Sequence, residues 1–297
     1  LLLCTIPPAL ASLQPLFALP GPPLPGSWFE NLAVRPNGAI LATRGDAPEI
    51  WQIDPSTRTG SRLVSVEGAF NLTGISQVDT SARQGKDETY VFASAYIPAP
   101  FQVGPGSAKV WTLTFTSTGP SVSLLKALPE AGFLNGLTAW DTGRVLIGDT
   151  LAESVYLIDV ETGVHTTPLV NMSGVNGVRV AKAEPGVVYW ANHNDLTLRR
   201  VKTDGNAVPT GAVEVLAGNL TGIDDFALQV GKSGKVEKAY IAGLTGNDVV
   251  EVVLGTGAKR VVGSDLTGTG AGLVTAVVLG RRKEDEKVLY ASAGQGG

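Results

Sequence analysis

The stretch Phe133-Leu-Asn-Gly-Leu-Thr-Ala-Trp140 is followed by Arg144-Val-Leu-Ile-Gly-Asp149 and then by Val155-Tyr-Leu-Ile-Asp-Val160. These three short apolar runs are separated by Gly, Asp and Thr, and each has the length of a β-strand rather than of a helix. The first run carries an Asn-Gly pair near its start. Similar phrases recur along the chain with other polar residues at that position, which indicates a repeated β-structure.

Six repeat units can be followed, and their first strands begin near residues 28, 72, 133, 175, 222 and 272. Five units contain four predicted strands. The sixth contains two, and the apolar run at 13–19 can supplement it. Repeats of about 40–60 residues with four strands each are typical of propeller blades. The sequence therefore predicts an all-β, six-bladed β-propeller of four antiparallel strands per blade, closed by an N-terminal strand in the last blade. A tandem of β-sandwiches is the alternative, but it would not explain the recurring phrase.

The composition agrees with a β-rich fold, because 37 Gly and 18 Pro among 297 residues are costly inside helices. The net charge of −4, without a basic stripe, argues against nucleic acid as a partner. No segment after the N-terminal region approaches the roughly 18 consecutive apolar residues of a membrane span. The expected partners are small-molecule substrates, and the sequence makes no prediction of the oligomeric state.

The N-terminal residues 1–11 contain the only cysteine, Cys4, and end in Ala9-Leu-Ala11. This pattern predicts the remnant of a secretory signal peptide, and an apolar N-terminal strand is the alternative. Residues 12–297 would then form a single propeller domain. Three Asn-x-Ser/Thr sequons predict glycosylation and a secretory or extracellular location. They begin at Asn71, Asn171 and Asn219.

Polar residues at the starts of the first strands should converge, because the innermost strand of each blade lines the central channel of a propeller. The carboxylates of Glu30 and Asp224 and the amide of Asn176 give an oxygen-rich set of the kind that Ca²⁺ prefers. The alternative is that these side chains satisfy backbone groups in turns. The ends of the second strands form a second ring, which includes Arg44, Asp149 and His193.

Four phrases occur in order along the chain: Glu30-Asn-Leu-Ala-Val-Arg-Pro-Asn-Gly38, Phe133-Leu-Asn-Gly-Leu-Thr-Ala139, Val175-Asn-Gly-Val178 and Asp224-Asp-Phe-Ala-Leu228. Together they resemble the senescence-marker/gluconolactonase-like six-bladed propellers, over about residues 29–290. Lactonases of that family hold a divalent metal through a Glu, an Asn and an Asp. The resemblance thus implies metal ligation by Glu30, Asn176 and Asp224, and a metal-dependent lactonase or esterase as one function. The family's Glu-Gly-Pro opening is Glu30-Asn31-Leu32 here.

More narrowly, the phrases resemble a secreted fungal branch that includes hetero-Diels–Alderases, which join a quinone methide to a terpene alkene. This resemblance implies a natural-product cyclase that requires no cofactor, acting at the channel mouth by holding two partners in a near-attack pose. The candidate catalytic residues are Arg44, Asn135, Asp149 and His193. The candidate substrate-binding residues are Trp28, Phe29, Tyr96, Phe101, Trp140 and Trp190.

Alternatives apply to several of these residues and to the function. Arg44 has an ion pair with Asp46 or Glu49 as its alternative, and the alternative for Trp140 and Trp190 is packing between blades. A non-catalytic, small-molecule-binding propeller is the third function considered.

Overall fold

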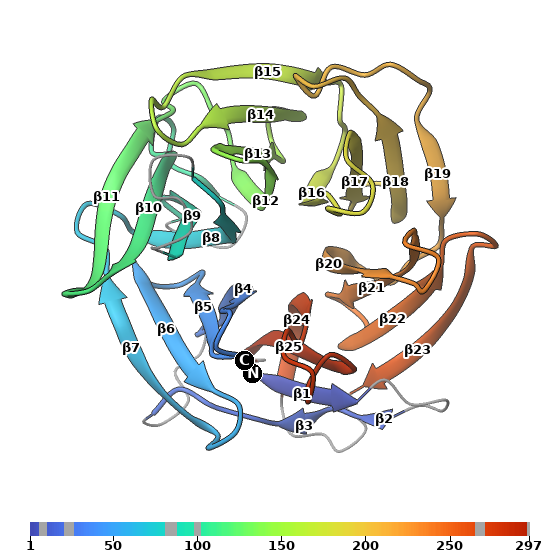
Figure 1. Cartoon of the computed structure of the whole chain (residues 1–297), viewed down its shortest axis with the longest axis horizontal. Coiled ribbons are helices and arrows are strands. Elements are labelled where there is room, and N and C mark those ends of the chain that lie inside the picture. Colours follow the sequence, from blue (N-terminus) through green and yellow to red (C-terminus); the bar gives the residue numbers. More distant parts are fainter. Residues whose placement is uncertain (6–10, 21–26, 81–87, 98–101, 265–270, 296–297) are drawn as a thin grey trace.

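The computed structural model describes residues 1–5, 11–20, 27–80, 88–97, 102–264 and 271–295, and none of these residues is helical. Their strands form six sheets arranged as a ring around a common centre (Figure 1). The predicted all-β propeller with four-stranded antiparallel sheets is confirmed. The described part of the chain offers no helix that could cross a membrane.

Five of the sheets are built from consecutive strands, each lying beside the next one along the chain. The first sheet has β4 (Phe29–Val34), β5 (Ile40–Arg44), β6 (Glu49–Asp54) and β7 (Thr59–Ser65). The second has β8 (Asn71–Val78), β9 (Glu88–Ala95), β10 (Lys109–Thr116) and β11 (Gly119–Ala127). The third has β12 (Leu134–Asp141), β13 (Arg144–Asp149), β14 (Ser154–Asp159) and β15 (His165–Val170). The fourth has β16 (Val175–Arg179), β17 (Val187–Asn192), β18 (Thr197–Lys202) and β19 (Glu214–Ala217). The fifth has β20 (Ile223–Val230), β21 (Val236–Gly243), β22 (Asp248–Val253) and β23 (Ala258–Ser264), and β2 (Ala11–Ser12) adds to it in parallel with β23.

The sixth sheet combines both ends of the chain. Its strands are β24 (Ala271–Leu279), β25 (Val288–Gln295), β1 (Leu2–Thr5) and β3 (Gln14–Pro15), in that order. Leu2 lies opposite Ala291 in an antiparallel pairing of β1 with β25. The strand beside β25 therefore comes from the segment interpreted as a signal-peptide remnant. The predicted run at 13–19 contributes only β3, at the outer edge.

The innermost strands β4, β8, β12, β16, β20 and β24 all have a register shift near their start. In β16, for example, Val175 pairs with Asn192 and Val178 pairs with Trp190, so an extra residue is accommodated between them. A bulge bends the strand and redirects side chains. In β4, β12, β16 and β20, the residues at the bulges include the polar residues that the sequence places at the strand starts, whereas the first shift in β24 falls at Leu273.

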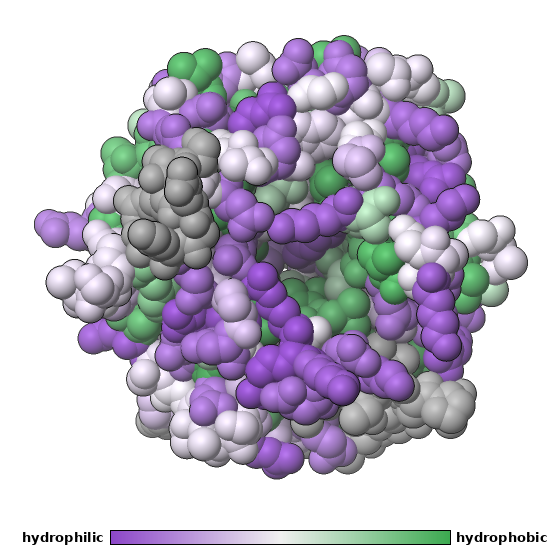
Figure 2. Space-filling view, in the orientation of Figure 1, coloured by the Kyte–Doolittle hydropathy of each residue, from purple (hydrophilic) through white to green (hydrophobic). Residues whose placement is uncertain are grey.

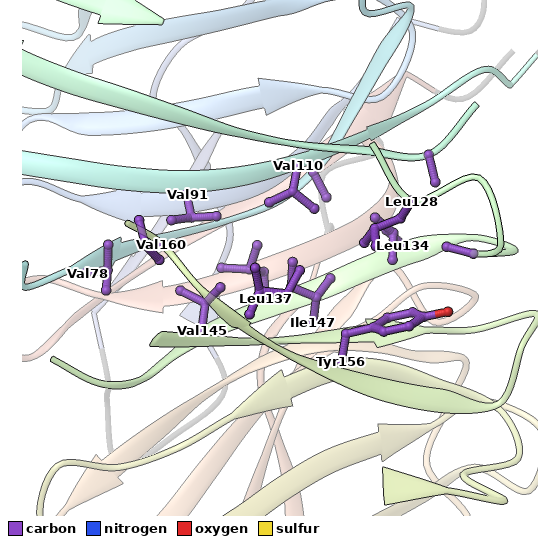
Figure 3. Close-up of a cluster of buried hydrophobic side chains, with 14 residues drawn as sticks. Val78, Val91, Val110, Leu128, Leu134, Leu137, Val145, Ile147, Tyr156 and Val160 are labelled. Carbon is purple, nitrogen blue, oxygen red and sulfur yellow. The ribbon is translucent and has the colours of Figure 1, made fainter. Parts of the chain in front are cut away.

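The hydrophobic core lies between neighbouring sheets rather than at the centre of the ring. Figure 3 shows one such cluster, in which Val91 and Val110 of the second sheet pack near Leu137 and Val145 of the third. These four side chains are at most 1% exposed. Complete burial of such a side chain contributes about 1.5–3 kcal/mol. Because packing between sheets stabilises the ring, its centre can carry polar groups.

Candidate functional site in the central channel

Glycines allow the innermost strands to approach one another closely at their starts. A Cβ on Gly74 would lie 2.2 Å from the carbonyl oxygen of Asn135, and one on Gly136 would lie 2.5 Å from that of Asn176. A Cβ on Gly177 would lie 2.8 Å from the Cα of Asp225. The recurring Asn-Gly pairs therefore reflect strand packing, in which only a residue without a Cβ fits.

In two of the innermost strands a polar residue occupies the position that glycine occupies in others, and these two residues contact each other. Asp225 follows Asp224 as Gly177 follows Asn176, and Asn31 follows Glu30 in the same way. The Nδ2 of Asn31 donates a hydrogen bond of 2.6 Å to Oδ2 of Asp225, although the residues are 194 positions apart. Asn31 and Asp225 are 2% and 1% exposed. The first and fifth sheets are thus joined across the channel.

Arg179 completes this polar link at the end of β16. Its Nη2 pairs with Oδ2 of Asp225 at 2.5 Å, its Nε donates to the carbonyl of Phe226 at 2.9 Å, and its Nη1 donates to the carbonyl of Leu137 at 3.0 Å. The guanidinium therefore ties β12, β16 and β20 together. Arg179 was not predicted from the sequence as a site residue. The only local indication was a charged residue ending an otherwise apolar run, Val175-Asn-Gly-Val-Arg-Val180.

Glu30, Asn176 and Asp224 come together at the opposite end of the innermost strands. Burial raises the pKa of Glu30 to about 7, opposed by a 2.7 Å hydrogen bond from Nε1 of Trp28 and reinforced by the charge of Asp225. Burial, followed by the charges of Glu30 and Asp225, raises the pKa of Asp224 well above its usual range, and a hydrogen bond from Asn176 opposes this rise. Two neighbouring carboxyl groups in this environment favour either a bound proton or a cation.

The chemistry of this set fits a hard divalent cation. The Oδ1 of Asn176 is buried and has no hydrogen-bond partner, and every candidate ligand is an oxygen, as Ca²⁺ prefers. No group of three or more His, Cys, Asp or Glu side chains that could hold a metal occurs among the described residues. A cation at this point would be held by Glu30, Asp224 and the amide oxygen of Asn176.

Two of the predicted catalytic residues, Arg44 and Asp149, are occupied by protein partners. Arg44 forms ion pairs with Asp46 and, at 3.0 Å, with Glu49. Asp149 is fully buried, and its carboxylate accepts backbone hydrogen bonds from residues 132, 133 and 152. Asn135 is 5% exposed at the channel. His193 is exposed, and partial burial of its ring lowers its pKa.

The predicted aromatic residues differ in their surroundings. Trp190 and Phe29 lie in the packed core, at 2% and 3% exposure, while Nε1 of Trp140 donates to the carbonyl of Gly205 at 3.3 Å. Tyr96 contacts the exposed ring of Phe70, with ring centroids 4.6 Å apart. Trp28 bonds to the buried carboxyl groups, because its Nε1 donates to Glu30. Phe101 lies outside the described residues.

A cavity of about 470 Å³ opens at the end of the channel where the innermost strands finish. Figure 2 shows a hollow at the centre of the ring, with hydrophobic surface on the side of β20 and β24. The lining comes from the ends of β16, β20 and β24 and includes Arg179, Leu228 and Leu279. Another cavity of about 470 Å³ lies at the outer rim, between His165 and Val208.

Comparison with known proteins gives relatives in sequence and in fold. No protein-family model matches the chain. A Phoma sp protein named "Putative hetero-Diels-Alderase" is 25% identical over 90% of this chain and 83% of its own length. A Sarocladium schorii protein of the same description is 23% identical over 90% of this chain and 75% of its own length. The solved structure of the calcium-binding protein regucalcin from Agrobacterium tumefaciens covers 93% of this chain and 96% of its own, with a TM-score of 0.60 and 14% identity. The chain is thus similar in sequence to proteins described as hetero-Diels–Alderases and shares its propeller fold with regucalcin.

Proposed function

We propose that this protein is a natural-product enzyme that catalyses an intermolecular hetero-Diels–Alder cycloaddition between a quinone methide and a terpene alkene. The observation that carries the proposal is the similarity to two proteins described as hetero-Diels–Alderases over 90% of the chain. We interpret the six sheets as six blades, with the N-terminal strand completing the last one. A secretory or extracellular location and glycosylation belong to the same proposal.

The reaction requires positioning rather than a nucleophile. The oxygen and the exocyclic carbon of the quinone methide each form one bond to an alkene carbon, giving a dihydropyran, and no proton or electron enters or leaves. Holding both partners in a near-attack pose can supply about 7–11 kcal/mol of the barrier. Donors near the quinone methide oxygen stabilise the charge that develops there. Asn135 and His193 are our candidates for this role, because Arg44 and Asp149 bond to protein partners.

The test is a cycloaddition assay with a precursor that releases an ortho-quinone methide in the presence of a polyene terpene. We expect the protein to accelerate adduct formation and to give an enantiomeric excess, measured by chiral chromatography. A racemic adduct formed at the rate of buffer alone would overturn the proposal. Dialysis against a strong chelator should leave the rate unchanged.

A metal-dependent lactonase is the second candidate, favoured by the buried oxygen set of Glu30, Asn176 and Asp224. A bound cation would polarise the lactone carbonyl as a Lewis acid, and the chain's own residues would hold that cation. This candidate predicts one tightly held divalent ion by elemental analysis. It also predicts that Ca²⁺ raises the melting temperature of the wild type but not that of Glu30→Gln. Absence of both effects would exclude it.

A further inference from the structure

We propose that the cavity where β16, β20 and β24 end binds an uncharged, largely hydrocarbon molecule that carries one hydrogen-bond acceptor, of the class of an acyclic terpenoid alcohol. We call this cavity the tail chamber. It is lined by residues 179–183, 227, 228, 230 and 277–279. Identifying this molecule as the alkene partner of a cycloaddition rests on the proposed function, whereas the binding itself does not.

The walls of the tail chamber are aliphatic and incompletely covered. Val180, Leu228 and Leu279 are only half-buried, and Val230 is 45% exposed. The first three also pack against three different inter-sheet cores, so the wall is anchored in rigid structure. A concave, mostly apolar cavity with few polar groups is the usual form of a small-molecule site, and about 470 Å³ lies in the usual size range.

The polar group at the inner end of the tail chamber favours a neutral ligand over an anion. Asp225 already neutralises the Arg179 guanidinium at 2.5 Å. A guanidinium has five N–H donors, and the bonds of Arg179 to Phe226, Leu137, Val178 and Asp225 use four of them. The remaining N–H can orient one acceptor on the ligand.

The mouth of the tail chamber is crossed by a weak polar contact that a ligand can displace. Nζ of Lys182 pairs with Oδ2 of Asp79 at 2.9 Å, and these side chains are 90% and 64% exposed. Exposed ion pairs of this kind contribute roughly 0–1 kcal/mol. The rim therefore restricts the entrance without sealing it.

The tail chamber is separate from the cluster of Glu30, Asn176 and Asp224. Asn176 stands near the start of β16 and Arg179 at its end. At about 3.3 Å per residue, these positions are roughly 10 Å apart along the strand. The buried link of Asn31, Asp225 and Arg179 joins the strands between the two ends. A hydrocarbon in the tail chamber would thus not share its site with a cation at Glu30.

The test is calorimetric titration of the full chain with farnesol, a sesquiterpene alcohol. Ala183→Trp would fill the tail chamber from an exposed wall position, and Ala212→Trp, exposed between β18 and β19, is the matched control. We expect saturable binding by the wild type and by Ala212→Trp, and at least tenfold weaker binding by Ala183→Trp. Leu228→Gln, which places an amide in the wall, should also weaken binding by at least tenfold.

The inference is overturned if farnesol does not bind, if Ala183→Trp and Leu228→Gln bind it as the wild type does, or if Ala212→Trp loses binding equally. The cycloaddition assay separates this outcome from failure of the proposed function. Farnesol binding that depends on the tail chamber, without adduct formation, would refute the cyclase alone. Adduct formation that Ala183→Trp leaves unchanged would refute the assignment of the alkene partner to the tail chamber and leave the cyclase standing.

Discussion

Glu251 on β22 shows how a single buried charge can make the stability of this fold depend on pH. Its side chain is 3% exposed and pairs with Nζ of Lys238 at 2.8 Å and Nε of Arg260 at 2.7 Å. Burial alone would raise its pKa, but the two cations outweigh burial and lower the pKa from 4.5 to about 2. Because the folded pKa lies below the unfolded one, the stabilisation is present above pH 4.5 and is lost as the pH falls to about 2.

We expect Glu251→Gln to lower the free energy of unfolding by about 1–2 kcal/mol at pH 7, and by much less near pH 2. Urea denaturation at both pH values measures the difference. Glu214→Gln, which removes an exposed pair with Arg200, is the control and should change stability little. An equal loss for Glu251→Gln at both pH values would contradict the assignment.

Asn71 is a sequon residue whose amide is already used by the fold. It is 7% exposed, its Nδ2 donates to the carbonyl of Gly45 at 2.7 Å, and its Oδ1 accepts from the backbone of Ile97 at 2.9 Å. Asn171 and Asn219 are exposed. In folded protein from a secretory host, we expect glycans on Asn171 and Asn219 and none on Asn71. Peptide mass spectrometry tests this, and a glycan on Asn71 in the folded fraction would refute it.

At the scale of the strand, the glycines beside the bulges set how closely the innermost strands approach. A Cβ on Gly136 would meet the carbonyl oxygen of Asn176 and the Cα of Gly177, both at 2.5 Å and both backbone atoms that cannot rotate away. We expect Gly136→Ala to destabilise the fold by about 1–3 kcal/mol in chemical denaturation. Gly205→Ala has no neighbour within 4 Å and serves as control. Equal stabilities of the two variants would show that this contact does not limit the approach.

At the scale of the whole molecule, the sixth sheet depends on the first five residues. Leu1 and Leu2 are 7% and 5% exposed, and β1 covers the edge of β25 through four residue pairs. Removing residues 1–5 should reduce stability by about 3–5 kcal/mol, because two leucines lose their burial, and it should promote association through the open edge. Thermal denaturation and light scattering measure these effects, and replacement of exposed Gln14 by Ala should cause neither.

Mass determination of the secreted product tests the interpretation of residues 1–11. A product that begins at Ser12 would lack β1 and would have to close its last sheet in another way. A product that retains Leu2–Thr5 would agree with the pairing to β25. The first outcome would contradict the structural role that we assign to β1.

The sequence alone was sufficient to predict the all-β propeller. Short apolar runs with Gly and Pro between them are local features that follow from strand length and turn chemistry, and the recurring Asn-Gly pairs mark the repeat although their cause is strand packing. They also indicated that Glu30, Asn176 and Asp224 share one site, because equivalent positions of successive repeats must converge in a ring. The charges of Glu30 and Asp225 acting on Asp224 agree with this convergence.

Only the tertiary structure decided which side chains face the channel and which partners they take. The hydrogen bond between Asn31 and Asp225 spans 194 residues. Arg179 can bond to Asp225 and to two backbone carbonyls only because three strands meet at its guanidinium. The burial of Asn71 and Trp190 also depends on neighbouring sheets, because the same residues in an isolated strand would be exposed to solvent. Pairing and burial of this kind are properties of the assembled sheets, so no local pattern of residues encodes them.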